Sequence, residues 1–554
     1  MAPSALDRRV FQRLALAAIT CIPLLSKTTS MAQQPTTGET LTVTGHVVDA
    51  DSDTLLPCRL YLQNLDSLEW YFPASSDKAG SAIQYRKQIG NTRSLEMHTT
   101  LSAHPFSVTL PPGRYRLRVE RGKEYRPTER QFDAATQTMP VEVKLHRFVD
   151  MPQRGWYSGD THLHRVMDEL PNLVQAEDLN VAFPMNYWVR DSTETPSASG
   201  PPLEAKTIAV DPTHVIYPLN TEYEIFSVEK QRHTQGAVFV LNHKTPLHLP
   251  TPPTLSVAEE ARRQGALLDL DKHSWAWSMM IVPIMNVDLF ELSNNHNWRT
   301  QFAFPQWTIE NAPEWPEIER NEAGFTELGW TEFAMQTYYA LLNCGFRMRV
   351  TGGTGSGVHP VPAGHGRVYV HTGKEFSYDR WIANLNGGHS FVTTGPLMDL
   401  RFNDALPGTT WRLQHSKNSV LIKGEINGLN RLKSIEILRN GVIAKRLSVE
   451  PLQSSLGHWT YHIDSTIELS DSSWVAVRCF EDLPDSKVSF AHTNPVYVDV
   501  QNRPLIPRRR DAEFFVQRMD QELVRNQGIL SEESLGEYRR AREIYQSILD
   551  RAKD

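Results

Sequence analysis

Alternating polar and apolar positions mark the first part of the chain as β-structure. Residues 114–119 (RYRLRV) follow a Pro-Pro-Gly turn and change between the two kinds at every step. A period of two places Tyr115, Leu117 and Val119 on one buried face of a strand. Because other short strands with turn-rich ends occur nearby, the pattern predicts an N-terminal β-sandwich over 41–147.

A second region of alternating positions lies towards the C-terminus. Apolar residues flank Asn440-Gly441, the dipeptide that most strongly favours a two-residue hairpin. Residues 474–480 (WVAVRCF) form another short run with strand character. We therefore predict a second β-sandwich over 396–500.

Beyond residue 510 the apolar positions recur with helical spacing. The stripe consists of Leu535, Tyr538, Ala541, Ile544, Tyr545 and Ile548. Ser531 is suited to cap a second helix, and residues 526–528 (NQG) break the pattern. The spacing predicts a helical hairpin over 511–554, with its stripe packed onto the body of the protein. A dimer interface is the alternative.

The central region, residues 150–395, mixes both periods. Helical patterns over 255–268 and 332–342 alternate with short apolar runs such as 238–241. Alternating strands and helices favour an α/β layer arrangement, here a distorted barrel. The predicted fold class is therefore multidomain α/β plus all-β, with the barrel between two β-sandwiches and a helical hairpin at the end.

Composition agrees with a folded protein of several domains. The 554 residues are 40% hydrophobic and 22% charged, which is typical of globular chains and argues against disorder. At about 150 residues per domain, the length suggests three or four domains. The net charge of −7 argues against a general affinity for nucleic acid, and four cysteines without a CxxC motif argue against a disulfide scaffold.

The N-terminus is typical of a secretory signal peptide over 1–32. Three arginines come before an apolar run from Leu14 to Leu25, and small residues surround the expected cleavage point at Ala32. The run is shorter than the ~20 apolar residues that span a membrane. We therefore expect cleavage after Ala32 and a secreted or periplasmic bacterial protein that is not an integral membrane protein.

The clearest chemical motif is GWYSGDTHLH, residues 155–164. In a strand, residues two apart point to the same face, so His162 and His164 are placed to chelate one metal ion. Asp160 shares that face and could bind the ion or orient one of its ligands. Imidazole suits zinc, iron or manganese.

The same central region holds 12 of the 20 histidines. Further candidate ligands follow apolar runs there, except for Glu222, which precedes His243 by 21 residues, and His359, which lies in a glycine-rich turn. Imidazole and carboxylate side chains at the ends of successive strands are the arrangement that a metal site in a barrel requires. These candidates are Glu222, His243, His273, Glu291, His296 and His359. Each one alone is typical of a structural residue, but together they predict a metal centre.

The segments SGDTHLHR, VLNHK, DLFELSNNH and GSGVHPVPAGHGRVYV occur in this order between 150 and 395. They resemble the CehA/McbA-like metallohydrolases of the PHP (polymerase and histidinol phosphatase) superfamily. The resemblance implies a distorted β/α barrel and a hydrolase that uses one to three divalent ions on phosphate, carboxyl or carbamate esters. By matching position it makes ligands of His162, His164, Glu222, His243 and His359. The N-terminal region also resembles the sandwiches of the carboxypeptidase regulatory type, which carry no activity.

The chain departs from the family pattern at two places. Met185 and Asn186 stand where the second motif usually has an acidic residue and His-Asn, and Gly357 stands where the last motif usually has aspartate. A thioether and a glycine cannot replace a hard carboxylate ligand. The resemblance then implies one or two ions, substitute ligands from His273, Glu291 and His296, or a degenerate site.

The expected function is a secreted hydrolase in which a divalent ion activates water against an ester-type bond. Zinc is the first choice of ion, with manganese and iron as alternatives. His273 or Glu291 could act as general base, and Lys244 and Arg367 could stabilise negative charge on a substrate or transition state. The expected partner is a small-molecule or glycan-linked ester.

Two other functions stay open on the sequence alone. A catalytically degenerate PHP-like domain could serve as a ligand- or glycan-binding module, and the many tryptophans of the central region would suit such a role. A nuclease or phosphodiesterase of the same superfamily is the third candidate, although the negative net charge opposes capture of a polyanion.

Overall fold

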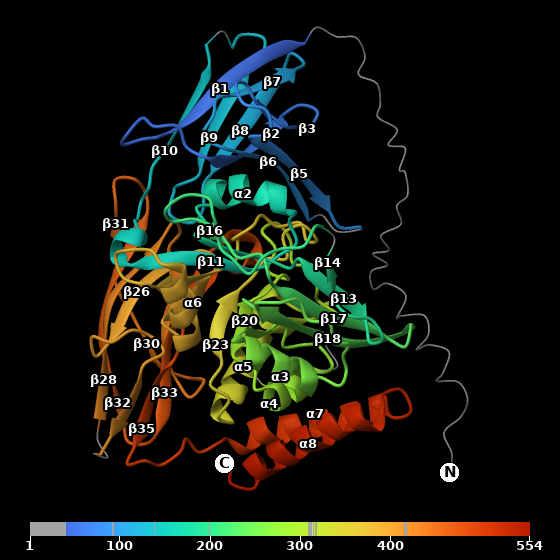
Figure 1. Cartoon of the computed structure of the whole chain (residues 1–554). Helices are drawn as coiled ribbons and strands as arrows, with labels where there is room; N and C mark the ends of the chain where they lie inside the picture. Colours follow the sequence, from blue (N-terminus) through green and yellow to red (C-terminus); the bar gives the residue numbers. More distant parts are fainter. Residues whose placement is uncertain are drawn as a thin grey trace. The chain divides into compact units, whose positions relative to one another are not determined.

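The computed structural model describes residues 40–90, 94–137, 139–198, 200–307, 313, 315, 318–414 and 418–553. The signal peptide predicted over 1–32 lies outside these residues. From Leu41 onwards the chain forms one compact unit. Its described part is mixed α/β, with six sheets and seven α-helices (Figure 1).

The N-terminal part consists of two sheets that share one hydrophobic core. Their strands are β1 (Leu41–Asp49), β2 (Cys58–Asn64), β3 (Trp70–Tyr71), β4 (Ala74–Ser75), β5 (Ala82–Gln88), β6 (Leu95–Leu101), β7 (Phe106–Leu110), β8 (Arg114–Glu120), β9 (Thr128–Asp133) and β10 (Val141–Leu145). One sheet has the order β10-β1-β7-β4 and the other β5-β6-β2-β8-β9, with β3 paired to β2. Tyr115, Leu117 and Val119 of β8 are fully buried in this core, which confirms the predicted alternation.

A seven-stranded sheet occupies the central region. Its strands are β13 (Tyr187–Asp191), β14 (Ser197–Ala198), β17 (Thr221–Val228), β18 (Gln231–Leu241), β19 (Leu267–Leu270), β20 (Leu289–Ser293) and β23 (Arg349–Gly352). The helices of this region are α2 (Leu170–Ala176), α3 (Leu255–Gln264), α4 (Ser278–Met285), α5 (Glu327–Asn343) and α6 (Tyr378–Gly387). The sheet order is β14-β13-β17-β18-β19-β20-β23, and helices α4 and α5 connect its last three, parallel strands.

The helix predicted over 255–268 is shorter than expected. It ends at Gln264 because Gly265 adopts the left-handed conformation, with φ of 70°. The apolar residues that follow form β19 at the centre of the sheet. The prediction was therefore wrong for the last turn, since an apolar run of four residues fits a buried strand as well as a helix.

A twelve-stranded sheet joins the central and C-terminal regions. Its strands are β11 (Trp156–Leu163), β12 (Val181–Pro184), β15 (Ile208–Ala209), β16 (Val215–Ile216), β24 (Arg367–His371), β25 (Ser390–Thr393), β27 (Thr410–Leu413), β29 (Leu432–Arg439), β30 (Val442–Arg446), β33 (Ser473–Glu481), β34 (Phe490–Thr493) and β35 (Val496–Val500). Strand β25 pairs with β34, so the sheet continues across residue 396, where the sequence predicted a domain boundary. Asn440 and Gly441 both have positive φ and connect β29 to β30 as the predicted hairpin turn.

Two smaller sheets complete the strand inventory of the described residues. They consist of β26 (Leu397–Phe402), β28 (Asn418–Gly428), β31 (Leu452–Gln453) and β32 (Trp459–Leu469), and of β21 (Arg320–Asn321) and β22 (Gly324–Phe325). Strands β26, β28 and β32 share a hydrophobic core with β29, β33 and β35.

The two large sheets meet on both sides of the end of β11. On one side, β12 belongs to the twelve-stranded sheet and is followed after two residues by β13 of the seven-stranded sheet. On the other side, the segment after β23 bonds to β11: Gly355 N donates to His162 O at 2.7 Å, and His164 N donates to Ser356 O at 2.8 Å. The histidine pair of the GDTHLH motif therefore lies at the junction of the two sheets.

The C-terminal helices α7 (Arg509–Asn526) and α8 (Glu532–Leu549) form the predicted hairpin, red in Figure 1. Ser531 caps α8 by accepting a hydrogen bond from Ser534 N. Most of the apolar stripe of α8 is buried against the body of the protein. The carboxylate of Glu537 accepts hydrogen bonds from Thr254 N and Leu255 N at the start of α3, so the hairpin also caps a helix of the central region.

Three cysteines are described, and all of them, Cys58, Cys344 and Cys479, are buried and free. This agrees with the absence of a disulfide pattern in the sequence. In the part of the chain that the structure describes, no helix combines the length and the apolar composition that a membrane crossing requires.

A buried cluster of charges connects the N-terminal sheets to the central region. Asp178, after α2, receives hydrogen bonds from Arg121 at 2.8 Å and from Arg147 at 3.0 Å. Beside it, Arg59 on β2 pairs with Glu177 and with Glu120. The positive charges around Asp178 lower the pKa of its carboxyl group far below its usual value. The negative charge of Asp178 therefore holds two arginines of the N-terminal region in place.

Replacing Asp178 by asparagine is expected to lower the free energy of unfolding by about 3 kcal/mol, because it leaves Arg121 and Arg147 partly buried without their shared carboxylate. Asparagine keeps the size of the side chain and tolerates the positive φ of this position, so the change isolates the charge. Urea denaturation at pH 7 measures the effect. The control is Asp66→Asn, which removes an exposed ion pair with Arg114 and should leave the unfolding curve almost unchanged. An equal effect of both changes would contradict a structural role for the cluster.

Candidate metal centre

One face of the seven-stranded sheet carries a row of acidic side chains. Glu222 on β17 pairs with Phe239 on β18, and Phe239 pairs with Asp269 on β19. Asp269 in turn pairs with Leu289 on β20, two residues before Glu291. Directly paired residues share a face, as do residues two apart, so Glu222, Asp269 and Glu291 point to the same side of the sheet.

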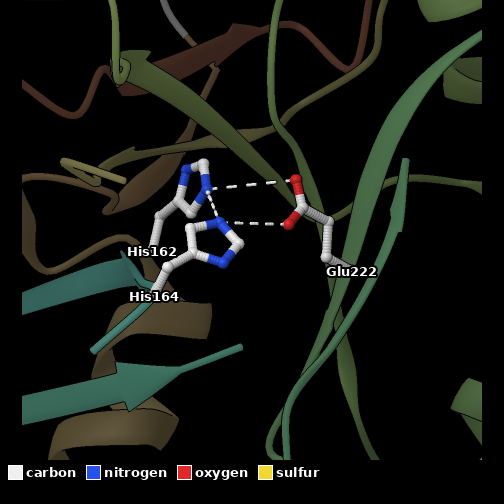
Figure 2. A group of neighbouring side chains, drawn as sticks. All are labelled: His162, His164 and Glu222. Atoms are coloured by element: carbon white, nitrogen blue, oxygen red, sulfur yellow. Dashed lines mark hydrogen bonds and ion pairs between the residues drawn. The ribbon is translucent and has the colours of Figure 1, made fainter. Parts of the chain in front are cut away.

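The end of β11 brings two imidazoles to this acidic face (Figure 2). The Nε2 atoms of His162 and His164 lie 3.0 Å apart. The two carboxylate oxygens of Glu222 lie 3.2 Å from Nε2 of His164 and 3.9 Å from Nε2 of His162. With bonds of about 2.0–2.2 Å, tetrahedral zinc spaces its ligand atoms about 3.4 Å apart. The three side chains can therefore bind one ion together.

The other ring nitrogen of His162 faces a second pair of carboxylates. Nδ1 lies 3.3 Å from an oxygen of Glu291 and 3.7 Å from Oδ1 of Asp271. The second oxygen of Asp271 pairs with the ammonium group of Lys272 and accepts from the indole N–H of Trp275 at 3.2 Å. A histidine that binds a metal through one nitrogen commonly donates the other N–H to a carboxylate, which fixes its tautomer and its orientation.

The buried carboxylates around His162 and His164 favour the binding of a cation. Glu222, Asp271 and Glu291 are almost completely buried, and each has one oxygen without a hydrogen-bond donor among the described residues. Burial, together with neighbouring Asp271 and Asp269, raises the pKa of Glu291 well above its usual value. With all three carboxylates ionised, Lys272 alone leaves a charge of −2 in the group. A divalent cation balances that charge and uses the unpaired oxygens, so the residues present fit such an ion.

The same environment keeps His162 in its neutral form. Burial first, and then the neighbouring side chains of His164 and Lys272, lower the pKa of His162 well below its usual value. Neutral imidazole is the form that binds metals. The ring of His162 also packs on Phe239, with centroids 4.4 Å apart, so its position is fixed on the sheet side.

Asp160 lies two residues before the histidine pair but outside the metal-binding group. Its carboxylate accepts hydrogen bonds from His162 N at 3.0 Å, from the hydroxyl of Thr354 at 2.6 Å and from Gly364 N at 2.8 Å. Burial raises its pKa to about 6. Asp160 therefore connects the end of β11 to the loop over 354–364, and its place in the proposed ligand set is not supported by the geometry.

His296 and His359 lie beside the group without joining it. Their ring centroids are 6.3 Å apart, and His296 stacks on Phe304 at 3.8 Å. In the described part of the protein, Nδ1 of each has no hydrogen-bond partner. Burial first, and then the charge of Lys272, lower the pKa of both well below its usual value. Both are thus neutral neighbours of the metal-binding atoms.

The structure places His243 and Lys244 away from this group. Nε2 of His243 lies 2.9 Å from the hydroxyl of Thr221, and Nδ1 lies 3.0 Å from the carbonyl oxygen of Thr245. Both ring nitrogens are thus used within the protein, and burial lowers the pKa of His243 to about 4. Lys244 follows with an exposed side chain.

His273 and Arg367 also have structural surroundings. His273 lies between the rings of Trp330 and Phe333, and burial lowers its pKa to about 3. The guanidinium group of Arg367 donates to the carbonyl oxygens of Gly364, Asp178 and Glu177. Its donors are therefore occupied by the backbone, and the geometry does not support the predicted contact with a substrate.

The sequence interpretation missed Asp271, Asp269 and Lys272. Asp271 stands two residues before His273, directly after the apolar strand that was recognised there, and the histidine was chosen instead. Asp269 interrupts the apolar residues of β19, and an acidic residue inside a buried strand is itself a signal of a polar site.

At position 357, the structure explains why this chain has a glycine where the resemblance expects an aspartate. This residue has a φ of 110°, and a Cβ atom here would lie 2.1 Å from the carbonyl oxygen of His164. Its N–H donates to the hydroxyl of Tyr85 at 2.8 Å, and the same hydroxyl donates to the carbonyl oxygen of His359 at 2.8 Å. Strand β5 of the N-terminal region therefore holds the turn that passes behind the metal-binding histidines.

Met185 and Asn186 also serve the fold. The side chain of Met185 is buried in an apolar cluster, and its N–H donates to the carbonyl oxygen of Leu163 at 2.7 Å. The amide of Asn186 donates to the carbonyl oxygen of Pro218 at 2.9 Å. Met185, Asn186 and Gly357 stand where the resemblance expects further ligands. In this structure they serve core packing and hydrogen bonding that involves the backbone.

Comparison of the chain with protein-family models, with curated proteins and with solved structures finds no match. The resemblance to CehA/McbA-like metallohydrolases therefore stays a prediction.

Replacing Gly357 by alanine is expected to lower the melting temperature and to disturb the histidine pair, because the new methyl group would collide with the backbone of His164. The strained φ alone costs about 1 kcal/mol or more, and the collision adds to it. The control is Gly528→Ala, which has a φ of 74° but open space around the new Cβ. Thermal denaturation of both variants separates the cost of the backbone strain from the cost of the collision. Equal decreases in melting temperature would contradict the predicted collision.

Proposed function

We propose that this protein is a divalent-metal-dependent hydrolase that cleaves an ester-type bond of phosphate, carboxyl or carbamate chemistry. The observation that carries the proposal is the convergence of two imidazole nitrogens and one carboxylate within bonding distance of a common point. His162, His164 and Glu222 would hold the ion, with zinc as first choice and manganese or iron as alternatives. When bound, such an ion lowers the pKa of water towards ~7 and polarises a carbonyl or phosphoryl oxygen.

The residues of the chain prepare this site in distinct ways. His162 is neutral and offers Nε2, while its Nδ1–H is directed at Glu291. Glu291, predicted as a general base, lies behind His162, so its proposed task is to orient the imidazole. Lys272 and Trp275 hold one oxygen of Asp271 and leave the other towards His162. Three protein ligands leave a coordination position open, as catalytic zinc sites require.

The strand arrangement supports the distorted barrel that the sequence predicted. Strand β12 is followed by β13, and the segment after β23 bonds to β11, so β11, β12, β13, β17, β18, β19, β20 and β23 follow one another around the site. His162 lies near the end of β11, and Asp271 directly follows β19. Barrel enzymes place their catalytic residues at these strand ends. The N-terminal sheets and the sheets of 396–500 are then the flanking β-sandwiches.

We further propose that a single ion binds. A second ion on the opposite side of His162, between Asp271 and Glu291, would require both ring nitrogens to be deprotonated. It would also lie beside the ammonium group of Lys272, which already compensates Asp271. We also propose a secreted or periplasmic location, which is based on the predicted signal peptide alone.

The first test is elemental analysis of the chain without its predicted leader, residues 33–554, purified without a histidine tag. The wild-type protein is expected to carry about one divalent ion per chain, because the three ligands define one site. The double variant His162→Ala/His164→Ala should lose the ion, and the variant of the exposed His248, His248→Ala, should keep it. Absence of metal from the wild type, even after reconstitution, would contradict the proposal and favour a ligand-binding module.

The activity itself is tested with a panel of phosphate, carboxyl and carbamate esters. Metal-loaded wild-type protein is expected to hydrolyse at least one class, and the double variant should not. If the loaded protein has a native circular-dichroism spectrum and hydrolyses none of them, the metal site stands but the hydrolase assignment fails.

A separate prediction concerns Glu291. Replacing it by glutamine is expected to weaken metal affinity about 10- to 100-fold, because the neutral amide is a poorer acceptor for the N–H of His162. The number of ions per chain should stay at one. Competitive titration with a chelator measures the affinity, and elemental analysis measures the count. Two ions in the wild type and one in Glu291→Gln would instead assign Asp271 and Glu291 to a second metal site.

A further inference from the structure

Two arginines lie near the metal group, that is, His162, His164 and Glu222 with the neighbouring Asp271 and Glu291. Arg190 is half-buried and Arg232 is exposed, and neither guanidinium group has a protein acceptor among the described residues. Within the described residues, neither Arg190 on β13 nor Arg232 on β18 has a side-chain hydrogen bond or an ion pair. Both guanidinium groups contact the ring of Phe226 instead, with Cζ atoms 4.9 Å and 4.8 Å from its centroid. Arg190 also lies 5.3 Å from the ring of Trp188. Aromatic contacts thus hold both planar groups while their N–H edges keep no partner.

Arg190 lies on the same side of the sheet as Trp188, whose ring it contacts, and Arg232 lies beside Arg190 because both guanidinium groups contact the ring of Phe226. Trp188 pairs directly with Glu222, and Arg190 follows two residues later on the same side of β13. On β17, Phe226 lies four residues after Glu222, where the pairing of β17 with β18 shifts its register between Ile225 and Ser227. The ring of Trp188 is 5.1 Å from that of His164. Trp188 therefore connects the metal-binding histidines to the arginines.

The charges around the pair favour an external anion. Because both guanidinium groups contact one ring, their positive charges repel each other, and burial together with the charge of Arg190 lowers the pKa of Arg232. The nearby carboxyl group is Glu224, which interacts electrostatically with Arg190, Arg232 and Lys272. Among the described residues, no ion pair within 4.0 Å joins Glu224 to either arginine. Two repelling guanidinium groups without a carboxylate partner are suited to bind an oxyanion.

We propose that Arg190 and Arg232 bind a negatively charged oxyanion group of the substrate, a carboxylate or a phosphate, next to the ester that is cleaved at the metal group. The assignment to a substrate rests on the proposed hydrolase function, whereas binding of the anion does not. The pair takes the role that the sequence suggested for Lys244 and Arg367, one of which is exposed while the other is engaged by the backbone. The substrate class is thus an anionic ester with its charge at a distance from the reacting bond.

The test is isothermal titration calorimetry with benzoate, inorganic phosphate and the neutral analogue benzamide. Each probe is titrated into the full wild-type chain, both metal-loaded and after treatment with a chelator. Benzoate and phosphate are expected to bind in both states, and benzamide at least tenfold more weakly. The variant Arg190→Gln/Arg232→Gln should lose at least tenfold in affinity for both anions. Arg263→Gln, which removes an exposed guanidinium paired with Glu260, is the matched control and should bind as the wild type does.

The outcomes separate the anion site from the metal site. Benzoate binding that persists in the double arginine variant, with a native circular-dichroism spectrum, would overturn the proposal. So would benzoate binding that disappears on chelation but not on removal of the arginines, because the ion alone would then hold the carboxylate.

Kinetics with a matched pair of esters connect the site to the reaction. For 4-acetoxybenzoate, the arginine variant is expected to raise KM at least tenfold with little change in kcat. For neutral 4-acetoxybenzamide, KM should be unchanged. Equal changes for the two esters would overturn the substrate assignment. If neither ester is hydrolysed by any form, the hydrolase proposal is weakened, while the calorimetry still decides whether the arginines bind anions.

Discussion

The structure of the central region depends on how three buried carboxylates are compensated. Moving an ionised carboxylate out of water costs several kcal/mol, and Glu222, Asp271 and Glu291 all lie within reach of the imidazole of His162. Lys272 offsets one of these charges, and the histidines offset none while they are neutral. The proposed divalent ion would balance the negative charge that remains. Asp160, Gly357 and Tyr85 matter because they fix the backbone that brings the two histidines to the carboxylates.

Local rules were enough to predict the parts of the site that lie close together in the sequence. The period of two in THLH placed His162 and His164 on one side, and both face Glu222. Local rules failed for the parts of the site whose contacts depend on pairing between distant strands. Whether Asp271 or His273 faces the histidine pair is decided by the register of β18, β19 and β20, which no local pattern specifies. Likewise His243 stands at a strand end, as predicted, but Thr221 and Thr245 use both of its nitrogens.

The same distinction applies to the fold. Alternation in β8, the Asn440-Gly441 turn and the stripe of α8 are local features, and the structure has all of them. The continuation of one sheet across residue 396 arises from the pairing of β25 with β34, about a hundred residues apart. Composition could not indicate this, because each strand satisfies its own pattern wherever it pairs. The end of helix α3 is a smaller failure of the sequence prediction, since Gly265 ends the helix inside an apolar run that continues as β19.

The distribution of charge along the sheet face is more informative than the net charge of the chain. A net charge of −7 opposes long-range capture of a polyanion. Beside the buried carboxylates of the candidate metal site, however, Trp188 contacts both His164 and Arg190, and Arg190 lies next to Arg232; among the described residues neither arginine forms an ion pair. With an ion bound, the metal site becomes electrophilic and the arginine pair stays cationic. A small ester with one anionic group would then meet complementary charge at both of its ends, and a long polyanion would gain only a local contact against an opposing field. This favours a small anionic substrate over nucleic acid, because both ends of the small substrate would meet complementary charge at contact distance, where screening by salt is weak.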